Sequence, residues 1–130
     1  MNHHDHHPVI IAASEEPLLE LLSHTLHSYG IGADVARSHR ELLERCRHHH
    51  YQLIISRFLH PLISSPEEAR RLRGEGGATH LFLLSHTRDE KIVVTLLERG
   101  ANQFLSLPVS LGRLARKVRL ELEKYRPLCR

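Results

Sequence analysis

Charged and hydroxyl side chains stand at the ends of three short apolar runs in this sequence. Glu15 lies just beyond "PVIIAA", Arg57 directly follows "YQLIIS", and the pair Ser85-His86 closes the run "HLFLL". An arginine and a glutamate at neighbouring strand ends can pair strongly, and an arginine can also anchor an anion. No set of nucleophile, base and orienting acid can be assembled, because Ser85 and His86 are chain neighbours without a carboxylate at motif spacing.

The 13 histidines are the most unusual feature of the composition, and many gather in "HHDHH" (3–7) and "HHH" (48–50). Imidazole is a common transition-metal ligand, so binding of Zn²⁺, Ni²⁺ or Cu²⁺ is one interpretation. Residues 48–50 lie between a predicted helix and a predicted strand, so their rings cannot all converge, and we expect no specific metal site. Cys46 and Cys129 form neither a disulfide framework nor a paired metal motif.

Apolar runs alternate with helical patterns along the chain. The runs that predict strands are 8–13, 31–36, 51–56, 80–85 and 102–107. The second run is weak and is expected at an edge of the sheet. The residues that mark the helix starts are Pro17, Ser38, Ser65, Asp89 and Ser110.

Five successive β–α pairs predict an α/β fold: a five-stranded parallel sheet with five helices on its two faces, in three layers. One domain over residues 8–125 contains every element, and residues 1–7 and 126–130 are expected to be flexible. The apolar runs are too short to span a bilayer, and no secretory signal begins the chain. The net charge of +3 is too mild to argue for nucleic acid. We therefore expect a soluble protein of the reducing cytoplasm.

Five ordered segments of the chain resemble a response-regulator receiver domain, the flavodoxin-like (CheY-like) signalling module of bacterial two-component systems and phosphorelays. These segments are "EEPLLELL", "LIISRFLHP", "RRLR", "LFLLSHTRDE" and "RGANQFLSLPVS". Each segment alone is a weak signal, and their order and spacing make the resemblance specific over about residues 8 to 125. It implies the flavodoxin-like fold, with the functional residues at the carboxyl ends of the strands.

The resemblance also implies a degenerate phosphorylation pocket. The family's acidic pair after the first strand falls on Ser14 and Glu15, its phosphoacceptor aspartate on Arg57, and its lysine on Leu107. Magnesium requires several hard oxygen ligands, and an arginine cannot form an acyl phosphate. We expect Mg²⁺ binding and phosphorylation to be lost, with no cofactor and no enzymatic activity.

Other pocket positions keep the family's pattern or close the pocket. Ser85 matches the family's switch hydroxyl and Phe104 its switch aromatic residue. His86 stands where the family prefers a small residue and would cover the pocket, although a simple loop histidine is an equally good account. A salt bridge between Arg57 and Glu15 is predicted in place of the metal site. The alternative is that Arg57 leans into solvent.

The helix predicted over 89–99 is more apolar than a one-sided surface helix needs. By the family's register, Val94 and Leu97 face the sheet. Receivers commonly dimerise or dock partners through the face of the fourth helix, fifth strand and fifth helix, and an exposed apolar patch there indicates a partner. The predicted interface residues are Ile92, Val93, Leu96 and Phe104. The alternative is a slight shift of core packing.

The last helix carries more cations than carboxylates. The charged residues are Arg113, Arg116, Lys117, Arg119, Glu121, Glu123 and Lys124. Such a run is usually a solvated face. Because it lacks interleaved aromatic residues and a helix-turn-helix pattern, we expect no direct nucleic-acid binding.

Together these features predict a phosphorylation-independent pseudo-receiver that signals through contact with a protein partner or as a homodimer. Two alternatives stay open. The first is a divergent phosphorylatable response regulator in which Ser14, Glu15 or Ser56 takes over the chemistry. The second is a domain that senses an anion or small molecule in the same crevice, with Arg57 as the anchor.

Overall fold

The computed structural model describes residues 7–57, 79–86, 89–98 and 101–124 of the 130-residue chain. One parallel sheet has the strand order β2-β1-β3-β4-β5. The strands are β1 (Val9–Ala12), β2 (Ala33–Ala36), β3 (Leu53–Ser56), β4 (His80–Ser85) and β5 (Gln103–Ser106). The helices in the described ranges are α1 (Glu16–Ser28), α2 (His39–His48), α4 (Glu90–Glu98) and α5 (Leu111–Glu123). The predicted helix at Ser65 and most of both predicted flexible ends lie outside these ranges.

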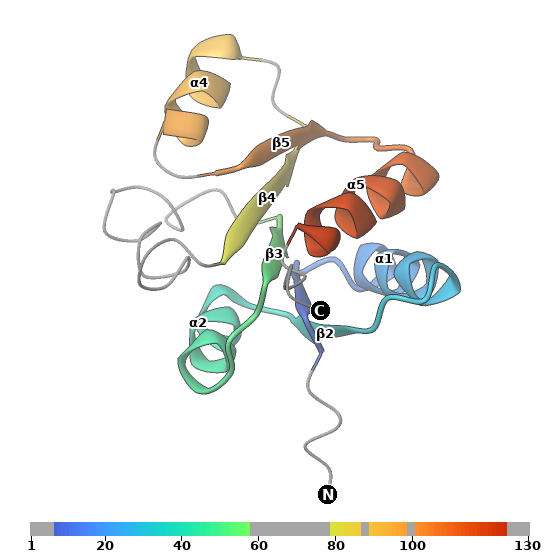
Figure 1. Ribbon diagram of the computed structural model, residues 1–130. Coiled ribbons are helices and arrows are strands. Elements are labelled where there is room, and N and C mark those ends of the chain that lie inside the picture. The colour runs from blue at the N-terminus through green and yellow to red at the C-terminus, as the bar shows by residue number, and fades with distance from the viewer. Residues whose placement is uncertain (1–6, 58–78, 87–88, 99–100, 125–130) are drawn as a thin grey trace, which may run out of the picture.

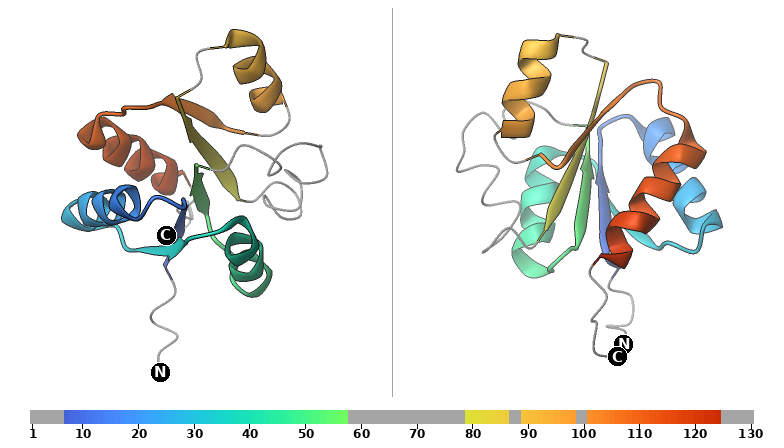
Figure 2. Two further views of the ribbon diagram at one scale, coloured as in Figure 1. Left: turned by 180° about the vertical axis from the view of Figure 1, so that it is seen from behind. Right: turned by 45° about the horizontal axis from the view of Figure 1, so that its top comes forward.

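The fold has three layers, as the alternation of strands and helices predicts. Helices α1 and α5 cover one face of the sheet, and α2 and α4 lie on the other (Figure 1; Figure 2). Every residue of β1 and β3 is buried, because both strands are interior and both of their faces are covered. Strand β2 is at the edge of the sheet, and three of its four residues are only partly buried, which confirms the prediction of an edge strand.

Local side-chain chemistry sets the helix ends. The Ser38 hydroxyl accepts a hydrogen bond from the Glu41 N–H at 3.0 Å, and the Glu41 carboxylate accepts one from the Arg37 N–H at 2.7 Å. The predicted cap at Ser110 is present too, since its hydroxyl accepts from the Arg113 N–H at 3.4 Å. These contacts replace hydrogen bonds that the first helical turns cannot make internally.

The α4 helix differs from the predicted register. Val94 is 51% exposed and Leu97 is 40% exposed, so the expectation that both face the sheet is wrong. The sequence of α4, EKIVVTLLE, is apolar at five of nine positions, which is more than one buried face can hold. Some of these residues must meet solvent however the helix is rotated, and the sequence does not say which ones.

Gly30 follows α1 with a φ of +81°, in the left-handed region that glycine adopts without strain. An added Cβ would meet nothing within 4 Å, so a substitution there tests backbone conformation alone. We expect Gly30→Ala to lower the free energy of unfolding by about 1 kcal/mol. Urea denaturation followed by circular dichroism measures this change. The control Gly30→Asn should cost less, because asparagine tolerates this region better; equal stability of Gly30→Ala and the unaltered chain would contradict the explanation.

Candidate functional site

The candidate site lies at the carboxyl edge of the sheet, where strand order reverses. Strand β1 lies between β2 and β3, so the chain leaves β1 toward one side of the sheet and β3 toward the other. Ser56 ends β3 and is paired in register with Ala12 of β1 and Leu83 of β4. Arg57 follows Ser56 directly, and its N–H donates to the Ala12 carbonyl at 2.8 Å. The backbone therefore holds Arg57 beside the segment that follows β1.

Arg57 and Glu15 form the predicted ion pair. The Arg57 Nε lies 3.3 Å from Glu15 Oε2, and the Arg57 side chain is only 22% exposed. The alternative in which Arg57 leans into solvent is therefore wrong. The pair is not the bidentate unit that an arginine and a carboxylate can form, since Arg57 Nε is buried and makes no hydrogen bond within the described ranges. Glu15 is 45% exposed, so the pair contributes on the order of 1 kcal/mol or less to stability.

The other predicted pocket residues reach the same edge but differ in burial. Ser85 ends β4 and is 4% exposed, whereas His86 and Ser14 are exposed. Leu107 follows β5, and its N–H donates to the Ser85 carbonyl at 2.8 Å. Its side chain is 8% exposed and packs in the core between the sheet and helices α1 and α5. The position that corresponds to the family's lysine therefore serves the apolar core.

A second ion pair lies at this edge, and the sequence patterns did not predict it. Arg37 follows β2 as Arg57 follows β3, and it donates two hydrogen bonds to Glu16, at 2.8 Å from Nε and 3.0 Å from Nη2. These bonds lower the pKa of the Glu16 carboxyl and raise the pKa of the Arg37 guanidinium. The sequence could have placed Arg37 at this edge, because a charged residue directly after any strand of a parallel sheet reaches the edge formed by the carboxyl ends of the strands.

The predicted partner interface is described only in part. Phe104 is half-buried and packs against the core on the side of α2. The side chains of Ile92, Val93 and Leu96 are outside what the structure describes. The exposed apolar residues that α4 does present are Val94 and Leu97.

The charged residues of α5 do not all lie on a solvated face, which corrects the sequence-based interpretation. Glu121 is 6% exposed, and its carboxylate contacts the ring of His80, at the start of β4. It lies three residues after the buried Val118 and seven after the buried Leu114, so the helical repeat turns it toward the sheet.

Three further features bear on chemistry at other places. Burial raises the pKa of the Cys46 thiol to about 11, so it stays protonated at neutral pH and is a poor nucleophile. No group of three or more metal-ligating side chains is found in the described part of the chain, which includes His48, His49 and His50. No helix within the described ranges is long and apolar enough to cross a bilayer.

The strand order and the helices on both faces define a flavodoxin-like α/β domain, in which ligand sites lie at the carboxyl ends of the strands. Residues 9–119 match the family described as the response regulator receiver domain. The chain belongs to this family and is a receiver domain of a two-component response regulator.

Known relatives support the same assignment. The chain is 26% identical over 116 residues to the uncharacterized transcriptional regulatory protein YkoG of Bacillus subtilis (strain 168). The match covers 89% of this chain and 51% of YkoG, so the chain spans about half the length of that relative. A receiver domain of a signal transduction histidine kinase from Syntrophus aciditrophicus is 27% identical, with a TM-score of 0.77 and 92% of each chain covered. The Francisella response regulator 1452 receiver domain has a TM-score of 0.76 at 19% identity, covering 92% of this chain and 99% of its own. The last likeness shows the fold alone.

Proposed function

We propose that this chain is a pseudo-receiver, which signals through contact with another protein and does not cycle through an aspartyl phosphate. The observation that carries this proposal is Arg57, which stands at the phosphoacceptor position with its Nε 3.3 Å from Glu15 Oε2. A guanidinium stays charged at any relevant pH and has no oxygen to accept a phosphoryl group.

The same residues fit Mg²⁺ poorly. Glu15 is the one carboxylate at the positions of the family's acidic pair and phosphoacceptor, and a guanidinium already lies against it. Ser14 offers a hydroxyl where the family has a carboxylate. Magnesium prefers several oxygen ligands in near-octahedral geometry, and a neighbouring cation repels it. The proposal therefore includes no metal, no cofactor and no enzymatic step.

Contact with a partner is the remaining way for such a domain to transmit a signal. We place the contact on the face formed by α4, β5 and α5, through which receivers commonly dock partners. The exposed Val94 and Leu97 show that α4 offers apolar surface. A structural relative supports self-association as one form of this contact. It is a beryllofluoride-activated NtrC4 receiver domain dimer with a TM-score of 0.77 at 19% identity, covering 91% of this chain and 98% of its own. A cytoplasmic location is part of the proposal.

Amide NMR spectra recorded during addition of Mg²⁺ and then beryllofluoride, which mimics an aspartyl phosphate, test the loss of phosphorylation. We expect the resonances of Glu15, Arg57, Ser85 and Phe104 to stay unchanged, because the pocket lacks both the carboxylate nucleophile and the metal ligands. Saturable shifts that spread from these residues to α4 would show a working switch and overturn the proposal. A parallel titration with inorganic phosphate separates the sensing alternative, since shifts centred on Arg57 and Ser85 without Mg²⁺ would favour an anion sensor.

A further inference from the structure

Asp34 lies at the amino-terminal edge of the sheet, close to the residues that lead into β1. It belongs to β2, which pairs with β1, and its side chain is only 17% exposed. Its Oδ1 lies 3.9 Å from His7 Nε2, and its Oδ2 accepts a hydrogen bond from the Tyr51 hydroxyl at 2.6 Å. One carboxylate oxygen is therefore held by the fold, and the other faces an imidazole nitrogen.

The separation between His7 Nε2 and Asp34 Oδ1 suits two ligands of one metal ion. A hydrogen bond from a ring nitrogen to an oxygen needs about 2.7 to 3.2 Å, so the pair at 3.9 Å does not form one. Zinc lies about 2.0 to 2.2 Å from histidine nitrogen or carboxylate oxygen, which puts two ligands of a tetrahedral ion about 3.3 to 3.5 Å apart. A small rotation of the partly exposed His7 side chain closes the difference.

Neighbouring residues fix both of these side chains. A Cβ added to Gly32 would lie 2.5 Å from His7 Nδ1, so the ring rests on glycine backbone with Nε2 toward Asp34. Burial and the hydrogen bond to Asp34 raise the pKa of Tyr51, so its hydroxyl stays a donor. Arg45 Nη1 lies 3.7 Å from the same Oδ2, the oxygen that is turned away from His7. Carboxylates that bind metals are commonly held by such contacts to their other oxygen.

Further imidazoles are close along the chain itself. His7 ends the segment "HHDHH", and His6, His4 and His3 precede it by one, three and four residues. An extended chain spans at most about 3.6 Å per residue, so all three stay within about 14 Å of His7 in any conformation. The described residues contain no group of three metal ligands, so a complete set must take at least one ligand from 3–6.

We propose that Asp34 and the histidines of 3–7 bind a divalent transition metal ion such as Zn²⁺ at the amino-terminal edge of the sheet. Zinc accepts mixed imidazole and carboxylate ligands, whereas Mg²⁺ and Ca²⁺ prefer oxygen ligands alone. The bound ion would fasten the segment before β1 to the edge strand β2. The site lies at the opposite edge of the sheet from Arg57 and Glu15, so it goes beyond the proposed function and does not depend on it.

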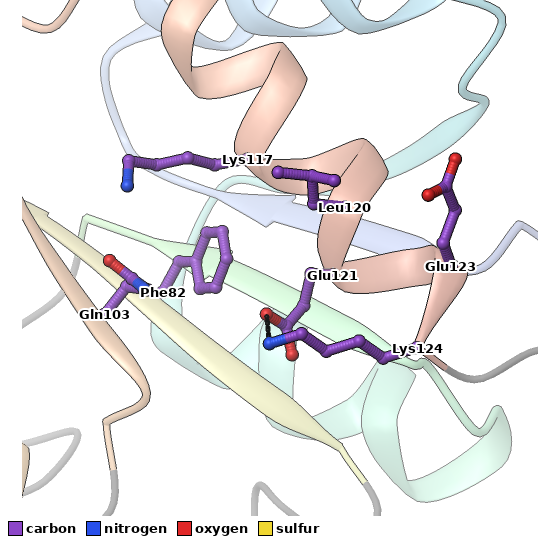
Figure 3. A pocket seen from close by; sticks show the side chains of 7 residues that line it. All are labelled: Phe82, Gln103, Lys117, Leu120, Glu121, Glu123 and Lys124. Carbon is purple, nitrogen blue, oxygen red and sulfur yellow. Dashed lines mark hydrogen bonds and ion pairs between the residues drawn. The ribbon is translucent and has the colours of Figure 1, made fainter.

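Other histidines make direct contacts with carboxylates. His80 begins β4, and its ring contacts Glu121 of α5. Figure 3 shows that Glu121 also faces Lys124, whose Nζ lies 3.5 Å from Glu121 Oε1. On α2, His48 Nε2 lies 3.1 Å from Glu44 Oε2. Among the histidine–carboxylate pairs of the described residues, His7 and Asp34 are therefore the pair that an ion can bridge.

Isothermal titration calorimetry with Zn²⁺ on the full chain tests the site. We expect one ion per chain, bound at least about ten-fold more tightly than by a synthetic peptide of residues 1–8, because the peptide lacks Asp34. Asp34→Asn keeps the shape of the side chain and should weaken binding by about ten-fold or more. Gly32→Ala should weaken binding several-fold without removing a ligand, because its Cβ takes the place of the His7 ring.

A double variant, His24→Gln with His27→Gln, is the matched control. Both histidines are exposed on α1, which covers the other face of the sheet from α2, whose Arg45 contacts Asp34. The double variant should change the affinity less than about two-fold. Paramagnetic Ni²⁺ locates the site independently, since it should broaden the amide resonances of Asp34 and Tyr51 before those of His24 and His27.

Three results would overturn the inference. Equal affinity of the peptide and the chain would show that the histidine-rich segment binds zinc without the fold. Unchanged affinity in Asp34→Asn, with the variant folded by circular dichroism, would remove the carboxylate from the site. A loss in the control double variant as large as that in Asp34→Asn would show adventitious binding to scattered surface histidines.

Discussion

Ser14→Asp and Arg57→Asp together are expected to create Mg²⁺ binding at the edge of the sheet where the unaltered chain has an ion pair. The two substitutions lower the local charge by three units, one at position 14 and two at position 57. They also place two new carboxylates beside Glu15. An opposite unit charge about 4 Å from an ion stabilises that ion by about 1 kcal/mol in bulk water and by about 4 kcal/mol near a protein surface. We therefore expect Mg²⁺ affinity to rise by more than about 100-fold.

Addition of Leu107→Lys to this pair should make the chain respond to beryllofluoride in the presence of Mg²⁺. The family uses a lysine at this position to hold the phosphoryl oxygens, and Leu107 follows β5 directly beside the end of β4. Leu107 is 8% exposed, so the lysine must extend its amine out of the core, which its long side chain allows. The expected result is a set of saturable amide shifts at Ser85 and Phe104.

The same NMR titrations on the unaltered chain and on Arg57→Lys provide the controls. Arg57→Lys keeps the positive charge and should bind no Mg²⁺. A triple variant that is folded by circular dichroism but shows no Mg²⁺-dependent shifts would contradict the explanation. It would mean that the pocket geometry, beyond the identity of three side chains, departs from that of a working receiver.

Phe82→Ala is expected to destabilise the fold strongly, with a loss of about 3 to 5 kcal/mol in the free energy of unfolding. Phe82 is 1% exposed and lies in β4, an interior strand, where it packs in the core beneath α1 and α5. Truncation to alanine deletes the buried phenyl ring and leaves a cavity, which the surrounding strands are too rigid to close. Domains of this size are stable by about 5 to 15 kcal/mol, so the loss is a large fraction of the total.

Urea denaturation followed by circular dichroism measures this loss as a lower midpoint at an unchanged slope. Leu21→Ala is the matched surface control, because Leu21 is 50% exposed, and its effect should stay within about 0.5 kcal/mol. Phe82→Leu fills part of the cavity and should cost less than Phe82→Ala, which keeps the test usable if the alanine variant does not fold. A loss below about 1.5 kcal/mol for Phe82→Ala would show that the core rearranges around the deletion.

Several features of the fold follow from short-range patterns that can be read without a structure. The apolar run "LIIS" is a strand buried on both faces, and the weaker run around Val35 is an edge strand. The caps at Ser38 and Ser110 and the left-handed Gly30 lie where their residue types predict. These features depend on neighbours within a few residues, so the sequence contains all that decides them.

The pairing of Arg57 with Glu15 could also be predicted, for a topological reason. Carboxyl ends of adjacent parallel strands meet at one edge, so residues within a few positions of the ends of β1 and β3 are neighbours whatever their side chains are. Such reasoning places two residues side by side but does not give the geometry of their contact. The salt bridge is present, but its geometry, with a single contact from Arg57 Nε to Glu15 Oε2 at 3.3 Å, could not be read from topology.

Rotation of a helix about its axis is the property that sequence patterns left undetermined. The sequence of α4 is apolar at five of nine positions, and the exposure of Val94 and Leu97 depends on how the helix rests on β5. Glu121 is a charged residue that the helical repeat directs inward, and its burial is tolerated because His80 reaches it from a strand 41 residues earlier in the chain. Such contacts link residues far apart in the sequence, and their energy depends on packing around both partners, which exists only in the assembled fold.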